Sequence, residues 1–281
     1  MLSGKQPRFI IPYHHTFFGS VISNLSSITP TVGPVGVFNW RTNMPEFDIV
    51  YILKPELDSE ELIYSLRSVE KNFPHRKVWF VGGKPKGLIP DVSLPHRQEG
   101  EDKWSLIRSS MYRVVGEEEL TERFFLFNDD FFVMKPFEGE FINYVDGSLT
   151  ERIEELRELN PWLNPYGRTL LKAREELKSL GYGEKNFDVH LPMLFTKAKV
   201  KEAIKQCSSP QMRSVYGNIT KEPCIEHKDV KVYDLESVPE DADFLSTNDK
   251  TFTEGKVGEY IRGVFSTPSR FETPTPKGVN K

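Results

Sequence analysis

The sequence predicts an α/β fold in which a mostly parallel, Rossmann-like sheet is flanked by helices. Apolar segments of strand length alternate along the chain with helical patterns, as they do where parallel strands are joined by crossover helices. One segment, Phe124–Phe127, is continuously apolar, which is typical of a strand buried on both faces. It runs directly into Asn128-Asp129-Asp130. Because ligands bind outside the carboxyl ends of the strands in open α/β sheets, we expect the functional site there.

The first half of the chain supplies the sheet. Phe47–Leu53 is the first buried-strand pattern, and residues 59–71 then carry apolar side chains at helical spacing. Asp58 and Glu61 stand at capping-box spacing where this helix should begin. Further elements are predicted at Lys77–Val81 (strand), Asp102–Val115 (helix) and Phe124–Phe127 (strand). This strand–helix–strand–helix–strand order implies right-handed crossovers.

The second half of the chain is more helical. We expect a helical insertion or lid at about residues 149–206, on a domain that spans residues 46–265. Helices are predicted at 149–159, 168–180, 196–206 and 257–264, and strand patterns at Val230–Val232 and Asp243–Ser246. Residues 1–45, with short strands at Phe9–Ile11 and Val35–Phe38, should pack on this domain as a strand-and-turn region. The Pro- and Thr-rich residues 266–281 should form a flexible tail.

Composition narrows the class of protein. The 281 residues are 38% hydrophobic and 28% charged, which is ordinary for a globular protein. The net charge of −4 shows no global basic footprint of a nucleic-acid-binding protein. Cys207 and Cys224 form neither a disulfide framework nor a zinc motif. No signal pattern and no apolar run near the roughly 20 residues of a membrane helix are found. We therefore expect a cytoplasmic protein without a membrane span.

The acidic residues after the central strand have two interpretations. Adjacent carboxylates beside a buried strand are costly unless a cation offsets their charge, and a divalent metal bridging Asp129 and Asp130 to phosphate oxygens would do so. The pair resembles the Asp-x-Asp motif of nucleotide-sugar glycosyltransferases with a Rossmann-like domain. Alternatively, the segment is a solvated turn. Asn248-Asp249, after a short apolar strand, either completes the metal site from across the cleft or forms a local Asx turn.

A histidine and several cations are further candidates. His190 stands between apolar residues and just before Pro192, so it is either a hydrogen-bonded core residue or a loop residue that deprotonates an acceptor hydroxyl. Arginine and lysine side chains could neutralise phosphate charge, although most such residues lie on the surface. These cationic candidates are Arg67, Lys103, Arg108 and Arg213. Hydrolase and dehydrogenase functions have little support, since neither a Gly-x-Ser-x-Gly elbow nor a complete dinucleotide fingerprint is present.

Taken together, these segments resemble the Stealth family, whose members transfer hexose-1-phosphate from a nucleotide-sugar. The matching stretches, in order, are Phe47–Tyr51 with Glu61–Glu70, Phe124–Phe132, Val189–Pro192 followed by Arg213, and Phe244–Asp249. They cover roughly residues 46–255. The second stretch is fairly specific, whereas the others are short. Two departures stand out. Ile52-Leu53-Lys54-Pro55 replaces the family's Trp-Val-Asp-Gly, which removes one acidic group, and the family's Asn-Ser-Asn segment is replaced around Asp102-Lys103-Trp104-Ser105.

The resemblance implies a GT-A-like domain and a set of site residues. Mg²⁺ or Mn²⁺ would be held on the donor diphosphate by Asp129 and Asp130, with Asn248 or Asp249. His190 would act on the acceptor hydroxyl. The implied catalytic residues are His190, Asp130 and Arg213, and the implied donor-binding residues are Asp48, Arg67, Lys103 and Asn128.

We therefore expect a metal-dependent transferase that moves hexose-1-phosphate from a nucleotide-sugar, most simply a UDP-sugar, to a hydroxyl of a glycan or other polymer. The alternative enzyme is a glycosyltransferase that forms a glycosidic bond on a glycan, a protein or a modified DNA base. A third possibility is a nucleotide-sugar-binding module without catalytic activity. The missing acidic residue after Leu53 favours it slightly, whereas the retained Asn128-Asp129-Asp130, His190 and Asn248-Asp249 argue against it. The negative net charge disfavours a nucleic-acid acceptor but leaves it open.

Overall fold

The computed structural model describes residues 47–54, 59–97, 103–138 and 141–273, which belong to one compact unit spanning residues 40–281. The strands predicted at Phe9–Ile11 and Val35–Phe38 lie outside the described residues, as do Asp58 and residues 274–281. In the described part of the chain, no helix combines the length and apolar character that crossing a membrane requires.

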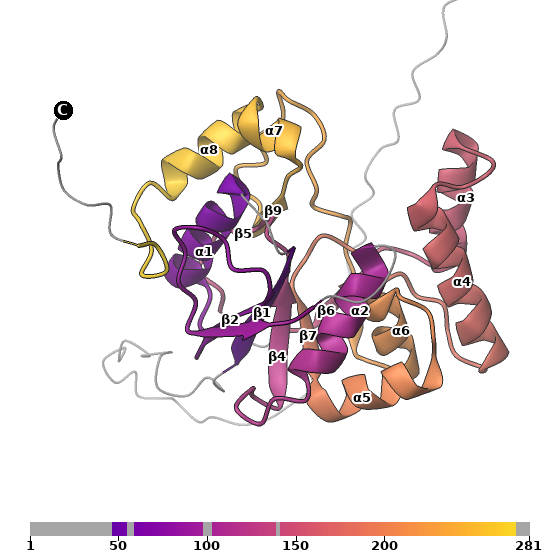
Figure 1. Ribbon diagram of the computed structural model, residues 1–281. Coiled ribbons are helices and arrows are strands. Elements are labelled where there is room, and N and C mark those ends of the chain that lie inside the picture. Colours follow the sequence, from indigo (N-terminus) through magenta and orange to yellow (C-terminus); the bar gives the residue numbers. More distant parts are fainter. Residues whose placement is uncertain (1–46, 55–58, 98–102, 139–140, 274–281) are drawn as a thin grey trace, which may run out of the picture. The chain divides into compact units, whose positions relative to one another are not determined.

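A five-stranded sheet in the order β3-β2-β1-β4-β7 lies at the centre of this unit (Figure 1). Its strands are β1 Asp48–Leu53, β2 Val78–Gly82, β3 Val92–Pro95, β4 Arg123–Phe127 and β7 Met193–Thr196. The first four are parallel, and β7 pairs antiparallel with β4. The predicted mixed α/β fold with a mostly parallel sheet is therefore confirmed, and the strand order is compatible with a Rossmann-like fold.

Helices cover both faces of the sheet. The helices are α1 Glu60–Asn72, α2 Lys103–Val114, α3 Leu149–Leu159, α4 Pro165–Ser179, α5 Lys197–Gln206, α6 Met212–Ile219, α7 Asp249–Thr253 and α8 Lys256–Val264. Alternate residues of β1 point to opposite faces. Thus Ile49 and Tyr51 pack with α1, whereas Val50 packs with the cluster that contains α2 and α3 to α6. Burial on both faces explains the continuous apolar character of β1 and β4.

Two small sheets flank the central one. The strands β5 Phe131–Val133 and β9 Phe244–Ser246 pair antiparallel, and β6 Asn143–Val145 pairs parallel with β8 Cys224–Glu226. The first of these sheets matters for function, because β5 follows Asn128-Asp129-Asp130 and β9 precedes Asn248-Asp249. Pairing β5 with β9 therefore brings the two acidic segments of the sequence together.

The strand order creates a switch point at the centre of the sheet. The chain proceeds outward from β1 through β2 to β3 and then returns to the other side of β1 as β4. Crossovers therefore leave the carboxyl ends of β1 and β4 in opposite directions, and a crevice opens between them. The carboxyl end of β4 carries Asn128, Asp129 and Asp130, and that of β1 carries Lys54. The predicted location of the acidic segment, at a strand end beside a crevice, is thus confirmed.

Helix boundaries differ from the predicted ones where a different residue caps the helix. The N-cap of α1 is Ser59, whose hydroxyl accepts a hydrogen bond from the Leu62 N–H at 3.3 Å, so the predicted capping box from Asp58 to Glu61 is wrong. Helix α4 begins at Pro165, capped by Asn164, rather than at Arg168.

The predicted insertion is not purely helical. Its helices α3 and α4 form a hairpin, but Met193–Thr196 then enters the central sheet as β7 before α5 begins. The end of α3 also differs from the amphipathic prediction, because Leu159 is 85% exposed. The strand expected at Val230–Val232 is instead an extended segment that makes a single parallel bridge, from Lys231 to Ser246. Helix α6 was not predicted.

The predicted flexible tail is wrong for its first part. Phe271 is buried against the cluster that contains α1, and Glu272 forms an ion pair with Arg67 of α1 at 2.7 Å. A bridge between Leu88 and Glu272 also connects this segment to the chain that follows β2. Residues 266–273 therefore belong to the domain.

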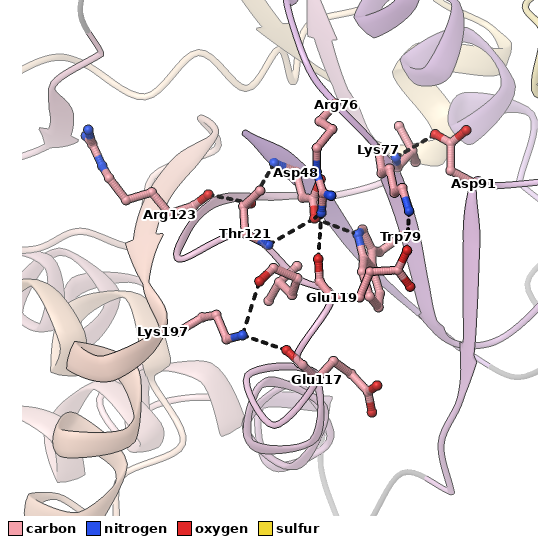
Figure 2. Close-up of polar contacts among 12 residues, drawn as sticks. Asp48, Arg76, Lys77, Trp79, Asp91, Glu117, Glu119, Thr121, Arg123 and Lys197 are labelled. Atoms are coloured by element: carbon pink, nitrogen blue, oxygen red, sulfur yellow. Dashed lines mark hydrogen bonds and ion pairs between the residues drawn. The ribbon is translucent and has the colours of Figure 1, made fainter. Parts of the chain in front are cut away.

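Asp48 holds the opposite end of the sheet together. It is the first residue of β1, fully buried, and its carboxylate accepts hydrogen bonds from Arg76 (2.9 and 2.7 Å), Trp79 Nε1 (3.0 Å) and the Thr121 N–H (3.1 Å) (Figure 2). A strand of this length separates its two ends by almost 20 Å. The prediction that Asp48 binds the donor is therefore wrong, because its carboxylate lies at the amino end of β1.

Replacing Asp48 with alanine should destabilise the fold by about 3–5 kcal/mol, because the Trp79 Nε1–H and the Thr121 N–H lose their buried acceptor and the ion pair with Arg76 is removed. The free energy of unfolding in urea measures this effect. Ligand binding by the folded fraction should be unchanged, since Asp48 lies away from the crevice. A loss of ligand binding without a loss of stability would contradict the structural role.

Candidate functional site

Two adjoining cavities open at the carboxyl ends of β1 and β4. The first, about 680 Å³, contains His190, Asp188, Asp229 and Arg213, and we call it the histidine cavity. The second, about 670 Å³, contains Glu61, Asp129, Asp130 and Asp249, and we call it the carboxylate cavity. The residues that line both are Ile52, Lys103, Ile107, Asn128, His190 and Lys231. The two cavities thus form one continuous site at the switch point.

Asp130 carries the most informative atom of the carboxylate cavity. Its Oδ2 accepts hydrogen bonds from Lys231 Nζ at 2.7 Å and from Ser246 Oγ at 3.2 Å. Its Oδ1 is buried and has no hydrogen-bond partner among the described residues. A buried, unpaired carboxylate oxygen is costly, so a ligand or cation at this position would relieve the penalty.

Asp129 and Asp249 line the same cavity. Burial and then the neighbouring charge of Asp130 raise the pKa of Asp129, as expected where two carboxylates are close together. The structure thus brings together all three predicted metal-binding carboxylates, those of Asp129, Asp130 and Asp249. Among the described residues, however, no three His, Cys, Asp or Glu side chains are arranged to hold a metal ion by themselves. The residues fit a cation such as Mg²⁺, which typically takes one or two carboxylates and completes its shell with phosphate and water.

Asn248 is committed to a helix. Its side-chain oxygen accepts hydrogen bonds from the N–H groups of Lys250 and Thr251, both at 3.0 Å, and so caps α7. Both lone pairs of the oxygen are therefore used. The local-turn interpretation is therefore correct for Asn248. Of the pair Asn248-Asp249, only Asp249 remains a candidate metal ligand.

Glu61 was not among the predicted site residues, yet it lies in the carboxylate cavity and is 7% exposed. Burial raises the pKa of its carboxyl to about 7, with smaller contributions from the charges of Asp130, Asp129 and Asp249. A hydrogen bond from Thr247 Oγ1 at 2.5 Å opposes this rise. The carboxyl group of Glu61 is thus able to exchange a proton near neutral pH.

The raised pKa of Glu61 predicts a pH-dependent stability. The native protein keeps this proton up to about pH 7, whereas the unfolded chain releases it near 4.5, so stability is lost as the pH rises between these values. Glu61→Gln stays neutral at every pH and does not undergo this loss. The stability of Glu61→Gln relative to the wild type should therefore rise from pH 5 to pH 8, by up to roughly 3 kcal/mol. Urea unfolding without divalent cations at both pH values measures the difference. A difference that does not vary with pH would contradict the assignment.

His190 forms a dyad with Asp229. The distance from His190 Nδ1 to Asp229 Oδ2 is 2.6 Å, and the His190 backbone N–H donates to Asp229 Oδ1 at 3.0 Å. Burial opposes ionisation of Asp229, but its hydrogen bonds and the charge of His190 outweigh burial and lower the pKa of its carboxyl. An ionised Asp229 can only accept, so Nδ1 of His190 carries a proton, and Nε2 is the ring nitrogen that is left to accept one from a substrate. This arrangement suits a general base.

Arg213 places a buried positive charge in the histidine cavity. It is 7% exposed and donates to the carbonyl of Leu191 at 2.7 Å and to Asn128 Oδ1 at 3.4 Å. Its guanidinium also lies 5.4 Å from the centre of the Phe131 ring. Burial lowers its pKa to about 10, which leaves it charged at neutral pH. The structure thus brings Arg213 together with His190 and Asn128, as predicted.

Two other predicted cations lie elsewhere. Arg67 forms a bidentate ion pair with Glu272, and its guanidinium lies 4.6 Å from the centre of the Tyr64 ring. Arg108 donates to the backbone carbonyls of Ile204 and Ser209. Neither residue lines the two cavities, so the prediction that Arg67 binds the donor is wrong.

Lys103 lines both cavities, as expected of a donor-binding residue.

Asp229 and Lys231 line the site as well but were not predicted, because they lie in a polar segment without a recognisable motif. The only sequence signal was the apolar alternation of Val230 and Val232, which puts the intervening Lys231 on the opposite side.

Comparison with known proteins assigns no family. No protein-family model matches the chain, and a search of curated proteins returned no match.

Proposed function

We propose that this protein is a metal-assisted transferase that moves hexose-1-phosphate from a nucleotide-sugar donor to a hydroxyl group of a polymeric acceptor. The observation that carries the proposal is that a base dyad, His190 with Asp229, lines the same crevice as Asp130, whose Oδ1 has no hydrogen-bond partner among the described residues. One half of the crevice can activate a hydroxyl and the other can hold a diphosphate. The resemblance of the Phe124–Phe132 segment to the Stealth family points in the same direction.

The charges in the carboxylate cavity support the need for a cation. Its acidic lining residues are Glu60, Glu61, Asp129, Asp130 and Asp249, and its basic ones are Lys54, Lys103 and Lys231. A diphosphate entering alone would meet more negative than positive charge. Asp129 and Asp130, with Asp249, would hold Mg²⁺ or Mn²⁺, and the bound metal would neutralise charge on the diphosphate.

The residues of the chain itself account for the remaining steps. Asp229 orients the imidazole, and Nε2 of His190 takes the proton from the acceptor hydroxyl as the hydroxyl oxygen attacks the phosphorus that bears the sugar. The bond from this phosphorus to the bridging oxygen of the diphosphate breaks, and the nucleoside monophosphate leaves with that oxygen. Arg213 stabilises negative charge that develops on the transferred phosphate, and its burial strengthens this interaction. The continuous site formed by the two cavities holds donor and acceptor together, which replaces a collision between two molecules by a reaction within one complex.

The nucleotide product tests the proposal. The protein is incubated with UDP-sugars, Mg²⁺ or Mn²⁺ and candidate polymer acceptors, and the released nucleotide is identified by chromatography. Transfer of hexose-1-phosphate releases UMP, whereas a GT-A-type glycosyltransferase releases UDP. Metal-dependent release of UMP would support the proposal. Release of UDP would favour the glycosyltransferase, and donor binding without turnover across the acceptors would favour a binding module.

A further inference from the structure

The segment between β8 and β9 presents a regular strip of side chains to the site. Asp229, Lys231 and Tyr233 all line the histidine cavity, while the intervening Val230 and Val232 pack against apolar clusters. This is the two-residue alternation of an extended chain, in which alternate side chains point to opposite sides. The backbone of the strip is fixed by β9, because the Val232 N–H donates to the Ser246 carbonyl at 2.8 Å.

Each member of the strip offers a different chemistry. Asp229 is already engaged with His190. Lys231 keeps an ammonium group in a position where only 14% of the side chain is exposed, and it lines both cavities. Tyr233 places an aromatic ring at the histidine cavity, and the residue is 66% exposed. A large exposed ring next to a nearly buried ammonium is not required by packing.

The chemistry of these groups matches one class of ligand. A nucleoside diphosphate carries a planar base that stacks on aromatic rings and a phosphate chain that attracts ammonium groups. Within the described part of the chain, Lys231 donates to one oxygen of Asp130 alone, which leaves two of its three N–H donors for phosphate oxygens.

We propose that Lys231 and Tyr233 form the donor-recognition strip of this protein, in which the ammonium group binds the diphosphate and the phenol ring stacks on the base. This inference rests on the proposed function, because it assigns residues to the nucleotide of the donor. It also explains why Lys231 and Tyr233 lie in the same short segment as Asp229. The same extended backbone positions the base dyad and the donor, so the two reactants are aligned by one structural element.

The experiment separates the two halves of the ligand. Affinities are measured by calorimetry or ligand-detected NMR, with Mg²⁺ present, for four nucleoside diphosphates (UDP, CDP, GDP and ADP), for the nucleoside of the best one, and for inorganic pyrophosphate. Lys231→Met should weaken binding of the nucleoside diphosphate and of pyrophosphate by about tenfold or more, and leave nucleoside binding unchanged. Tyr233→Ala should weaken the nucleoside diphosphate and the nucleoside by about fivefold or more, and leave pyrophosphate unchanged.

Matched variants control for stability and charge. Tyr112 is 67% exposed and lies outside both cavities, so Tyr112→Ala should bind every probe as the wild type does. Lys197 donates to the carbonyls of Glu117 and Leu120 away from the site, so Lys197→Met removes a lysine that is held in place without touching the ligand (Figure 2). Lys231→Arg, which retains the charge, should stay within about threefold of the wild type. If Lys231→Met does not fold, Lys231→Gln, which is polar but uncharged, tests the same loss of binding.

The outcomes are distinguishable. If the wild type binds a nucleoside diphosphate and the Lys231 and Tyr233 variants bind it equally well, the strip is wrong and the proposed function stands. If both variants weaken all three probes alike, the strip has only a structural role and the inference is also overturned. If the wild type binds none of the nucleoside diphosphates, both the inference and the proposed function fail.

Discussion

Replacement of His190 with alanine is expected to reduce the rate of transfer by about 10²–10⁴-fold, because the acceptor hydroxyl then loses its general base. Donor affinity should change little, since the imidazole acts on the acceptor. Steady-state kinetics measures the two effects separately, as kcat and as KM for the donor. Asp229→Asn should also lower kcat, because an amide no longer fixes the proton on Nδ1 of His190.

A second histidine supplies the matched control. His227 is exposed, contacts the Lys228 carbonyl through Nδ1, and lies outside both cavities. His227→Ala should therefore retain the full rate. Wild-type kcat in His190→Ala would refute the role of the dyad as a base.

Replacement of Asp130 with asparagine should reduce metal-dependent turnover by about a hundredfold or more and weaken the binding of divalent cations. The substitution keeps the shape of the side chain but removes the carboxylate charge, and the Oδ1 of this carboxylate has no hydrogen-bond partner among the described residues. Binding of Mn²⁺ can be followed by electron paramagnetic resonance, which requires no turnover. Thermal unfolding must accompany it, because the Lys231 ammonium loses its ion-pair partner.

Asp91 provides a carboxylate for comparison. It forms an ion pair with Arg270 and accepts a hydrogen bond from the Val78 N–H, and it lies outside both cavities. Asp91→Asn should therefore lower stability without changing the affinity for Mn²⁺. Equal Mn²⁺ binding by the wild type and Asp130→Asn would show that Asp130 does not hold the cation.

The central strands of the fold could be predicted because their burial produces a recognisable pattern in the local sequence. β1 and β4 are buried on both faces and so read as continuous apolar runs. β3 was missed because only Leu94 of its four residues is buried, which leaves no pattern to detect. α6 was missed because it is short. Its apolar residues Met212, Val215, Tyr216 and Ile219 do follow at helical spacing, but eight residues are too few for this period to stand out from a chance pattern.

The site was predictable only where a motif and a strand end coincide. Asn128, Asp129 and Asp130 follow β4 directly, so the sequence places them at the crevice. Asp48 belongs to the stretch Phe47–Tyr51 that resembles the family, but it is the first residue of β1 and so lies at the far end from the crevice. A resemblance in sequence does not show which end of a strand a residue occupies. Lys231 reaches the site through the pairing of its segment with Ser246, a contact that no local pattern encodes.

The pairing of β4 with β7 has a consequence for how such a protein can change its chemistry. β4 leads into Asp129 and Asp130, and β7 begins three residues after His190, with Leu126 opposite Met193 in the ladder. Backbone hydrogen bonds, rather than side chains, therefore set the distance between the proton acceptor and the acidic pair. If the proposed function is correct, substitutions at these positions would alter which bond is cleaved while the span between the reactants stays constant, so new specificities would arise on this scaffold without rebuilding it.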